Sequence, residues 1–474
     1  MNKFATIILA AGKGTRMNSQ RAKVLHTLLG KPLIEYPISL AQKVKSEKIV
    51  LVTGHQNIEV EKAAENTGIE NISFALQKEQ LGTGHAVLSA LPGLKGFKGP
   101  ILILSGDVPL LTVKTVNALK KAYKKSEAKA AFITFNALNP HGYGRVITNG
   151  SNAVAIREQK DCSEAEKKIT TVNAGIYLMD SLFLNKAVAA LKSENAQKEL
   201  YLTDVIEMAA KLGKVPTVNA HETEVTGVNS LLDLTLLQKK YLQIRMEKLM
   251  EKGVTIPFPE TVYIEDDCTV GSDSFIAQGV HIYGKTKIGK NVIIEQGVLI
   301  TDCIIRDDSI IRAYSVLEQA DVGNLAEVGP MGRLRPGSVL KKGAKVGNWV
   351  ELKKTTMGEG SKANHLAYLG DGEIGKNVNL GAGSIFCNYD GFLKHKTIID
   401  DNVFVGSDSQ IVAPVHIEEG AYVASGTTVV ANVPKGALAI SRTRQQNKKG
   451  YGILLKQRLK ARKEAMLKAA SDKK

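Results

Sequence analysis

A glycine-rich loop near the start of the chain has the residue types that bind phosphate. Residues 4–9 form a continuous apolar run typical of a buried strand, and A-A-G-K-G-T-R-M follows at residues 10–17. A strand that opens into such a loop brings backbone N–H groups close to a phosphate. Arg16 and Lys23 could neutralise the charge of that phosphate. A glycine loop alone identifies no reaction, so its meaning depends on the residues that accompany it.

A second apolar run ends in a carboxylate that could bind a divalent cation. Residues 101–104 read as a buried strand and lead into Ser105-Gly106-Asp107. Open α/β sheets bind ligands at the carboxyl ends of their strands, and carboxylate oxygens are ligands that Mg²⁺ prefers. A single Asp after a strand more often caps a helix or closes a turn. The phosphate-binding residue types upstream favour Asp107 as a metal ligand.

The second half of the chain repeats an apolar residue at every sixth position, from Ile264 to Val429, with occasional five-residue steps. Neither a helix nor a simple hairpin has a period of six. A parallel β-helix does, because each hexad is a short strand and a turn with one aliphatic residue pointing inward. A purely structural prism is the alternative, so activity must be argued from the site.

The six-residue rhythm is interrupted between Leu352 and Ile374, and this segment contains His365. Insertions in solenoids map to loops and often to the binding face. A histidine near its normal pKa can accept a proton at neutral pH, although a lone loop histidine is usually just exposed. We therefore expect a loop here that carries a candidate proton acceptor.

Length and composition indicate two or three domains. The chain has 474 residues, of which 43% are hydrophobic, as is usual for globular proteins. Residues 231–252 have apolar side chains at helical spacing and predict a linking helix. No apolar run reaches the eighteen residues of a membrane span. Four scattered cysteines without CxxC spacing indicate reduced thiols of a cytoplasmic protein.

The net charge of +16 is concentrated at the end of the chain. Residues 435–474 contain thirteen Lys/Arg and two Asp/Glu, a net +11. Such a segment could bind nucleic acid or an anionic surface. It lacks interleaved aromatic residues apart from Tyr451 and contains no nucleic-acid module. We expect a solvated, partly helical tail and no nucleic-acid partner.

The N-terminal half resembles the sugar-phosphate nucleotidyltransferases. L-A-A-G-K-G-T-R-M followed by Lys23 is similar to the signature of that family, and later segments follow in the expected order. The resemblance implies that Arg16 and Lys23 act in catalysis and that Asp107 and Asn229 bind Mg²⁺. The residues after Asn229, Ser230-Leu231, depart from the usual pattern. The implied UTP and UDP-N-acetylglucosamine contacts are Leu9, Ala10, Ala11, Gly12, Lys23, Gln77, Gly82, Thr83, Ser105, Gly106, Asp107, Gly144, Glu158, Asn173 and Asn229.

The C-terminal half resembles the left-handed β-helix of the hexapeptide-repeat acyltransferases. G-S-K-A-x-H-L-x-Y-L-G-D, with C-N-Y-D-G downstream, is similar to the acetyltransferase half of the bacterial bifunctional N-acetylglucosamine-1-phosphate uridyltransferases/glucosamine-1-phosphate acetyltransferases. The resemblance implies His365 as the general base and Glu351 as its orienting partner. Ser425 and Thr443-Arg444 depart from the family pattern. The implied sugar-phosphate contacts are Arg335, Lys353, Tyr368 and Asn379, and those to acetyl-CoA are Ala382, Asn388, Tyr389, Ser407, Ser425 and Arg442.

We therefore expect a mainly parallel, Rossmann-like α/β uridyltransferase domain at residues 1–230, a linker helix at 231–252, a left-handed β-helix at 253–445 and a basic tail at 446–474. The resemblance implies acetylation of glucosamine-1-phosphate by acetyl-CoA, uridyl transfer from UTP with release of pyrophosphate, and a cytoplasmic homotrimer. One alternative is a nucleotidyltransferase whose β-helix only oligomerises it, which His365 and its phosphate anchors disfavour. The other is a non-catalytic nucleotide-sugar or nucleic-acid binding protein, which Arg16, Lys23 and Asp107 disfavour.

Overall fold

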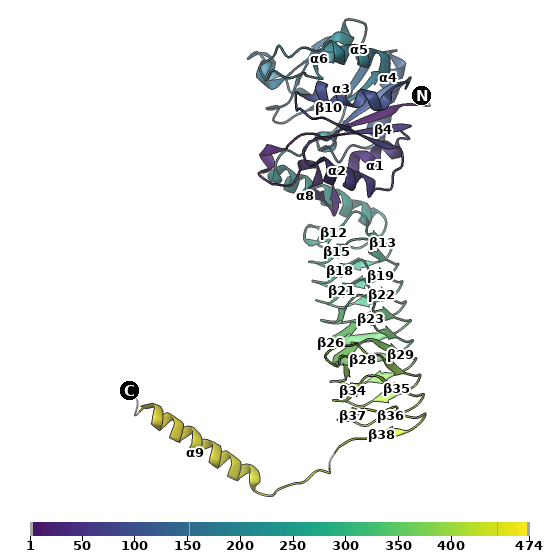
Figure 1. Cartoon of the computed structure of the whole chain (residues 1–474), viewed down its shortest axis with the longest axis vertical. Helices are drawn as coiled ribbons and strands as arrows, with labels where there is room; N and C mark the ends of the chain where they lie inside the picture. Colours follow the sequence, from purple (N-terminus) through teal and green to yellow (C-terminus); the bar gives the residue numbers. More distant parts are fainter. Residues whose placement is uncertain (1–2, 151, 443, 472–474) are drawn as a thin grey trace. The chain divides into compact units, whose positions relative to one another are not determined.

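The computed structural model describes residues 3–150, 152–442 and 444–471, with side chains described up to residue 468 (Figure 1). The chain divides into two compact units, one of residues 1–290 and 300–302 and the other of residues 291–299 and 303–474. This division falls within the hexad repeats, so the first coils belong to the N-terminal unit. The domain limits at residues 230, 252 and 445 stay a prediction.

The first unit is built on a mixed, mainly parallel sheet. Its strand order is β11-β7-β10-β6-β1-β4-β5, and β8 and β9 form a hairpin that pairs with β10. The strands β6, β1, β4 and β5 run parallel, whereas β10 runs antiparallel to β6 and β7. The bounds are β1 Ala5–Leu9, β4 Lys48–Thr53, β5 Ile72–Leu76, β6 Pro100–Ser105, β7 Ala130–Asn136, β8 Arg145–Asn149, β9 Asn152–Arg157, β10 Thr171–Asp180 and β11 Thr217–Asn219. The predicted α/β fold is confirmed.

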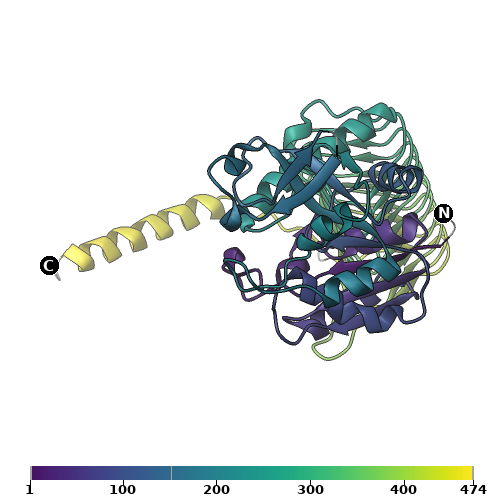
Figure 2. The same ribbon diagram turned by 90° about the horizontal axis from the view of Figure 1, so that it is seen from above.

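Helices cover both faces of this sheet (Figure 2). Successive side chains of a strand point to opposite faces, so Ile7 and Ile8 of β1 enter different apolar cores. One core includes α1 Glu35–Lys43, α2 Asn57–Glu65 and α4 Val113–Lys125. The other includes α3 Thr83–Ala90, α5 Ser181–Ala189 and α6 Asp204–Ala210. Two buried faces explain the uninterrupted apolar runs of the parallel strands.

The helix α8, Leu231–Glu251, begins at a well-defined cap. The Ser230 hydroxyl accepts from the backbone N–H of Asp233, and the Asp233 carboxylate accepts from the backbone N–H of Ser230. The same carboxylate accepts from the backbone N–H of Asn229 at 3.1 Å. Leu237 packs into a small core with Met17, Leu28, Leu33 and Val228. The start of α8 therefore fixes the backbone of a candidate metal ligand.

The hexads form stacked coils of short parallel strands. In the first unit β12, Tyr263–Ile264, pairs with β15, His281–Tyr283. In the second unit one column of strands has the order β19-β22-β25-β27-β29-β32-β35, of which Figure 1 labels β19, β22, β29 and β35. Its strands are β19 Ile304–Ile305, β22 Asp321–Val322, β25 Val339–Leu340, β27 Thr356–Met357, β29 Gly372–Ile374, β32 Thr397–Ile399 and β35 Val415–Ile417. The aliphatic hexad residues of this unit are buried, which confirms the predicted β-helix.

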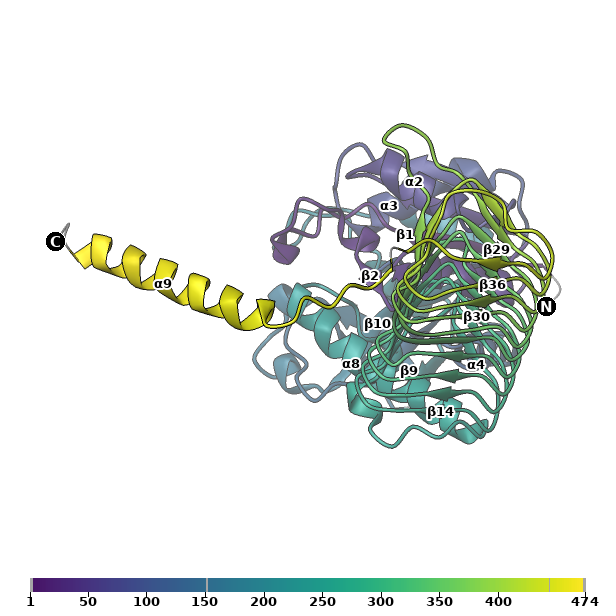
Figure 3. The same ribbon diagram turned by 90° about the horizontal axis from the view of Figure 1, so that it is seen from below.

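The predicted interruption between Leu352 and Ile374 is wrong. Met357, Ala363 and Leu369 are fully buried and continue the inward series through this segment at steps of five or six residues. The sequence pattern concealed the coil because methionine and alanine do not stand out as inward aliphatic positions. The chain instead departs from the coils after Phe386, at residues 388–396 (Figure 3).

Two long strands pass around a turn of the coil near His365. β26, Lys345–Lys353, and β28, Lys362–Gly370, pair in register over their length. Their backbones have positive φ at Trp349 and Leu366, which are 61% and 59% exposed. Positive φ is uncommon for residues of this size, so these two positions mark the turn between successive faces of the coil.

In its described residues the basic tail contains the helix α9, Tyr451–Ser471. All its described side chains, at residues 451–468, are exposed. Across the described part of the chain, α9 and the other helices lack the length or apolar character needed to cross a membrane.

Candidate functional site

A cavity of about 350 Å³ lies at the carboxyl ends of β1 and β6 and beside the start of α3. It brings together ten of the predicted nucleotide contacts: Leu9, Ala10, Ala11, Gly12, Lys23, Gln77, Gly82, Thr83, Ser105 and Asp107. Val24, Gln80, Ala86 and Glu199 also line it and were not predicted. Gly106, Gly144, Glu158, Asn173 and Asn229 are not among its lining residues. The cavity lies where parallel α/β sheets bind ligands.

The loop before α3 is held by the side chain of Gln77. This buried amide donates to the backbone carbonyl of Gly82 at 3.1 Å. Gly82 has φ +106°, and a Cβ there would lie 2.7 Å from the carbonyl oxygen of Leu200. Both the backbone conformation and the lack of space require glycine. The Gln80 amide donates to the Ala11 carbonyl at 2.6 Å, which connects this loop to the glycine-rich loop.

Four charged or polar side chains meet beside the cavity. The Lys23 ammonium donates to the Asp107 carboxylate and lies 3.4 Å from Asn229 Oδ1. The Arg16 guanidinium donates to the same Asn229 oxygen at 2.9 Å. Lys23 and Asp107 are less than one-fifth exposed. The Lys23 ammonium thus lies between the Asp107 and Asn229 oxygens. These are oxygen ligands of the kind that Mg²⁺ takes, so the donor set fits this ion.

The predicted sugar contacts lie around β9 and β10. The backbone N–H of Asn173 donates to the Gly144 carbonyl at 2.9 Å, and its side-chain amide donates to the Tyr177 hydroxyl at 2.7 Å. The Thr203 hydroxyl donates to Glu158 Oε1 at 3.0 Å. Burial raises the pKa of Glu158; the Thr203 hydrogen bond opposes the shift, and neighbouring carboxylates add to it. These hydrogen bonds fix the orientations of the partly buried Asn173 and Glu158 side chains.

On the β-helix, three predicted sugar-phosphate contacts lie after coil turns that are marked by positive φ at Met331, Trp349 and Leu366. They are Arg335, Lys353 and Tyr368. The Arg335 guanidinium pairs with the Glu351 carboxylate at 3.0 Å. The Lys353 ammonium lies 3.9 Å from the Asp371 carboxylate. Tyr368 pairs with Glu351 in the strand register of β26 and β28. Two cations at the ends of neighbouring strands can bind a phosphate.

His365 lies before the turn at Leu366 and has different neighbours. It pairs with Asn348 in the register of the two long strands and lines a cavity of about 680 Å³. Arg312, Lys345 and Lys362 also line that cavity, whereas Arg335, Lys353 and Tyr368 are not among its lining residues. In the described part of the chain, the Glu351 side chain pairs with Arg335 and has no described bond to His365. The orienting role of Glu351 stays a prediction.

The predicted acetyl-CoA contacts follow successive coils. A Cβ on Gly381 would lie 2.5 Å from the backbone nitrogen of Ser407, and a Cβ on Gly406 would lie equally close to that of Ser425. The Arg442 guanidinium donates to the Ser425 carbonyl at 3.0 Å. Ala382, Ser407, Ser425 and Arg442 therefore follow one edge of the coils, and the departure predicted at Thr443 falls outside the described residues. Asn379 pairs with Lys362, and Tyr389 lies 57% exposed in the segment that leaves the coil.

Comparisons with known proteins cover both halves of the chain. Residues 5–224 match the family model for nucleotidyl transferases, residues 258–357 match that of the GMPPB C-terminal domain, and residues 396–431 match the hexapeptide repeat of succinyl-transferase. The bifunctional protein GlmU of Geotalea uraniireducens is 47% identical and aligns over 96% of this chain and 99% of its own. Those of Pelobacter propionicus and Sorangium cellulosum are 47% and 44% identical and align over 97% and 96% of this chain and 100% and 98% of their own. The chain belongs to the GlmU family.

Membership of the GlmU family makes this chain a bifunctional transferase. Its nucleotidyltransferase half contains the cavity at the ends of β1 and β6, and its hexapeptide half contains the candidate acetyl-transfer residues. Glu199 shows what motif reading misses. Glu199 lies in a segment without a motif, and it reaches the GlmU cavity because the next residue, Leu200, accepts a hydrogen bond from Gly84.

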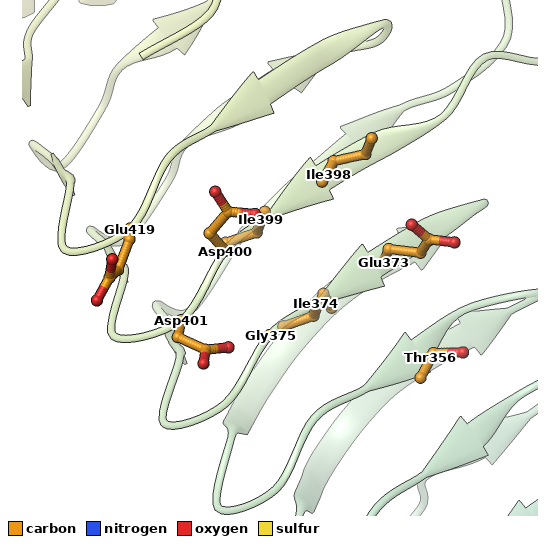
Figure 4. A pocket seen from close by; sticks show the side chains of 9 residues that line it. All are labelled: Thr356, Glu373, Ile374, Gly375, Ile398, Ile399, Asp400, Asp401 and Glu419. Carbon is orange, nitrogen blue, oxygen red and sulfur yellow. The ribbon is translucent and has the colours of Figure 1, made fainter. Parts of the chain in front are cut away.

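The β-helix of this GlmU member also has an acidic cavity of about 530 Å³, which Figure 4 shows from close by. Glu373, Asp400 and Glu419 point outward there, but they pair with Lys396, His416 and Lys435. Among the described residues no group of three or more His, Cys, Asp or Glu side chains is placed to hold a metal. These three carboxylates therefore act in structural ion pairs.

Proposed function

We propose that the two sites divide the two activities of the family between them. At the β-helix site an acetyl group passes from acetyl-CoA to glucosamine-1-phosphate. At the α/β site UMP passes from UTP to the resulting N-acetylglucosamine-1-phosphate, which gives UDP-N-acetylglucosamine and pyrophosphate. The observation that carries this assignment is the meeting of Arg16, Lys23, Asp107 and Asn229 beside the nucleotide cavity. This group combines two cations that can neutralise phosphate with two oxygen ligands of the kind that Mg²⁺ takes.

In uridyl transfer the sugar-phosphate oxygen attacks the α-phosphorus of UTP in line, and pyrophosphate leaves. Gln77 and the backbone at Gly82 and Thr83 bind the base, while the glycine-rich loop binds the phosphates. Lys23 and Arg16 stabilise the negative charge that spreads over the phosphates in the transition state. Asp107 and Asn229 would hold Mg²⁺, which would supply further positive charge to stabilise the departing pyrophosphate.

In acetyl transfer the sugar ammonium must lose a proton before its nitrogen can attack the thioester carbonyl. His365 takes this proton, the nitrogen forms the new amide bond, and CoA leaves as the thiolate. Arg335 and Lys353 hold the sugar phosphate, and Tyr368 and Asn379 contact the sugar. As the thiolate leaves, the new amide nitrogen gives its second proton to the thiolate and His365 releases the first proton to solvent, so the products are the amide, the CoA thiol and one proton.

We further propose that the protein acts as a homotrimer in the cytoplasm. His365 and Asn379 lie before the coil turn, whereas Arg335, Lys353 and Tyr368 lie after it. Side chains on two faces of one coil diverge, so a neighbouring copy would supply the missing face of the site. The four cysteines are free thiols, in keeping with a reducing compartment.

The test is a product assay with glucosamine-1-phosphate, acetyl-CoA and UTP, in which each is omitted in turn. Omission of UTP should leave N-acetylglucosamine-1-phosphate as the end product. Omission of acetyl-CoA should stop the sequence, and added N-acetylglucosamine-1-phosphate should restore UDP-N-acetylglucosamine. If the protein uses only the acetylated sugar and never makes it, the β-helix has no acetyltransferase role and the proposal fails.

A further inference from the structure

Asp371 is held between three successive coils of the β-helix. It follows β28 and precedes β29, and its backbone has φ +53°. Its backbone N–H donates to the Lys353 carbonyl at 2.9 Å, and its own carbonyl accepts from the Thr397 N–H at 3.2 Å. These bonds fix the backbone on both sides of the residue, so the direction of its side chain is determined by the coils.

The Asp371 carboxylate contacts two predicted site residues that have different substrates. Its Oδ2 accepts a hydrogen bond from the side-chain amide of Asn388, and it lies 3.9 Å from the Lys353 ammonium. Asn388 is 4% exposed, and the side chains of Lys353 and Asp371 are each 19% exposed. Lys353 belongs to the predicted sugar-phosphate contacts, and Asn388 belongs to those of acetyl-CoA. One partly buried carboxylate thus contacts both a predicted sugar-phosphate contact and a predicted acetyl-CoA contact.

The absence of a side chain at Gly370 brings these groups together. A Cβ at this position would lie 2.6 Å from both the Asn388 amide nitrogen and the Tyr368 hydroxyl. Real Cβ atoms do not approach this closely, so only glycine leaves room for the two polar groups. Tyr368, a predicted sugar contact, therefore lies in the same small cluster as Asp371, Lys353 and Asn388.

We propose that Asp371 is a positioning residue of the acetyl-transfer site, which holds Lys353 toward the sugar phosphate and Asn388 toward acetyl-CoA. This inference rests on the acetyl-transfer function proposed above. A lysine side chain is long and flexible, and a carboxylate within 4 Å restricts its ammonium to one side of the site. A buried amide without a partner is costly, so the bond to Asp371 also fixes which way Asn388 points.

The experiment compares Asp371→Asn and Asp371→Ala in the full-length protein. The amide of the Asn variant can still accept from Asn388 but has no charge for Lys353. Its KM for glucosamine-1-phosphate should rise about fivefold to tenfold, while its KM for acetyl-CoA should stay within about twofold. The Ala variant loses both contacts, so both KM values should rise. Uridyl transfer should be unchanged in each variant because its site lies on a separate core.

Two controls separate positioning from a general loss of structure. Asp302→Asn is the matched variant, since Asp302 also has positive φ but its carboxylate accepts from the backbone N–H of Lys285. It should leave both KM values unchanged. In a Lys353→Met background, Asp371→Asn should add nothing to the KM for glucosamine-1-phosphate, because the two residues act through one contact.

The outcomes are distinguishable. Unchanged KM values in folded Asp371 variants of an active enzyme would overturn the positioning role and leave the proposed function intact. An equal rise in KM with and without Lys353 would overturn the contact through which Asp371 is proposed to act. If the Ala variant does not fold, the Asn variant and the double variant decide the question. If the unmodified protein makes no N-acetylglucosamine-1-phosphate, the proposed function fails and this inference fails with it.

Discussion

The two candidate sites differ in how a single chain assembles them. The nucleotide cavity lies within one α/β sheet, and ten predicted residues from distant parts of the sequence line it together. The acetyl-transfer residues lie on an outward-facing coil, with His365 before the turn at Leu366 and Tyr368 after it. A concave site can be completed by one copy, whereas residues on diverging faces need a surface from outside the chain.

This difference predicts which changes at one site should alter the activity of the other site. Lys23, Asp107 and Asn229 depend on the packing of one unit and on the start of α8. The acetyl-transfer residues depend on the register of neighbouring coils and, as we propose, on association between copies. Changes in chemistry at one site should leave the other unaffected, while a change in association should affect only acetyl transfer.

The largest expected effect is that of His365→Ala on acetyl transfer. Loss of a general base typically costs about 10²- to 10⁴-fold in rate, and the other described residues of this cavity include no second histidine. The same protein should still convert N-acetylglucosamine-1-phosphate and UTP at the rate of the unmodified enzyme. Both half-reactions should be measured at saturating substrate. An equal loss of both activities in a folded, trimeric protein would contradict the separation of the sites.

Asp107→Ala should produce the opposite pattern. Removal of this carboxylate eliminates the proposed metal ligand and the partner of Lys23, so uridyl transfer should fall by at least about 100-fold. Acetylation of glucosamine-1-phosphate should continue without added metal. A chelator added to the unmodified enzyme should reproduce this pattern. Full uridyl transfer by the variant would remove Asp107 from the site.

Mixed trimers test whether two copies share the acetyl-transfer site. His365→Ala and Lys353→Ala should each be nearly inactive alone. Random mixing of the two in equal amounts should restore about one-quarter of the unmodified activity, because about one interface in four joins the two intact faces. The mixture should be refolded or co-expressed so that copies exchange. If activity stays at the level of the parent variants, each copy holds a complete site.

The pH dependence of the sugar-binding step should reveal Glu158. Burial raises the pKa of this carboxyl, so as pH falls it gains a proton at a higher pH than an ordinary glutamate does. If the ionised form accepts hydrogen bonds from the sugar, the KM for N-acetylglucosamine-1-phosphate should rise several-fold through that range. Glu158→Gln should lack this step and keep only the pH dependence of the substrate phosphate. Parallel profiles for both proteins would exclude the role.

The smallest expected effect is that of truncation after Gly450. The described side chains of α9 are exposed, so both half-reactions should change by less than about twofold. A shorter truncation after Lys468 provides the control. A loss of acetyl transfer beyond about tenfold, equivalent to about 1.4 kcal/mol, would show that the tail completes the acetyl-CoA site.

The sequence predicted the structure correctly where apolar residues recur with a fixed period. Ile282 and Val405 are buried because a coil with a fixed repeat must present one side chain inward at each step. It failed at Met357 and Ala363, since inward burial there comes from strand pairing with the coils on either side. The contact between Lys23 and Asp107 joins residues 84 positions apart. Residue types and the resemblance favoured both for one site, but spacing could not show that they pair directly.

The alanine at position 363 should affect where the β-helix unfolds locally. Ala363 is stacked between Val346 and Leu380 in the strand register, so this inward position buries a smaller aliphatic side chain than the positions on either side of it. Each missing methylene forgoes about 0.8 kcal/mol of burial, and in a repeat structure stability is a sum of local terms. The strand that carries His365 should therefore exchange its amide hydrogens earlier than the flanking coils. Local opening of the column would begin at the strand that carries the proposed general base.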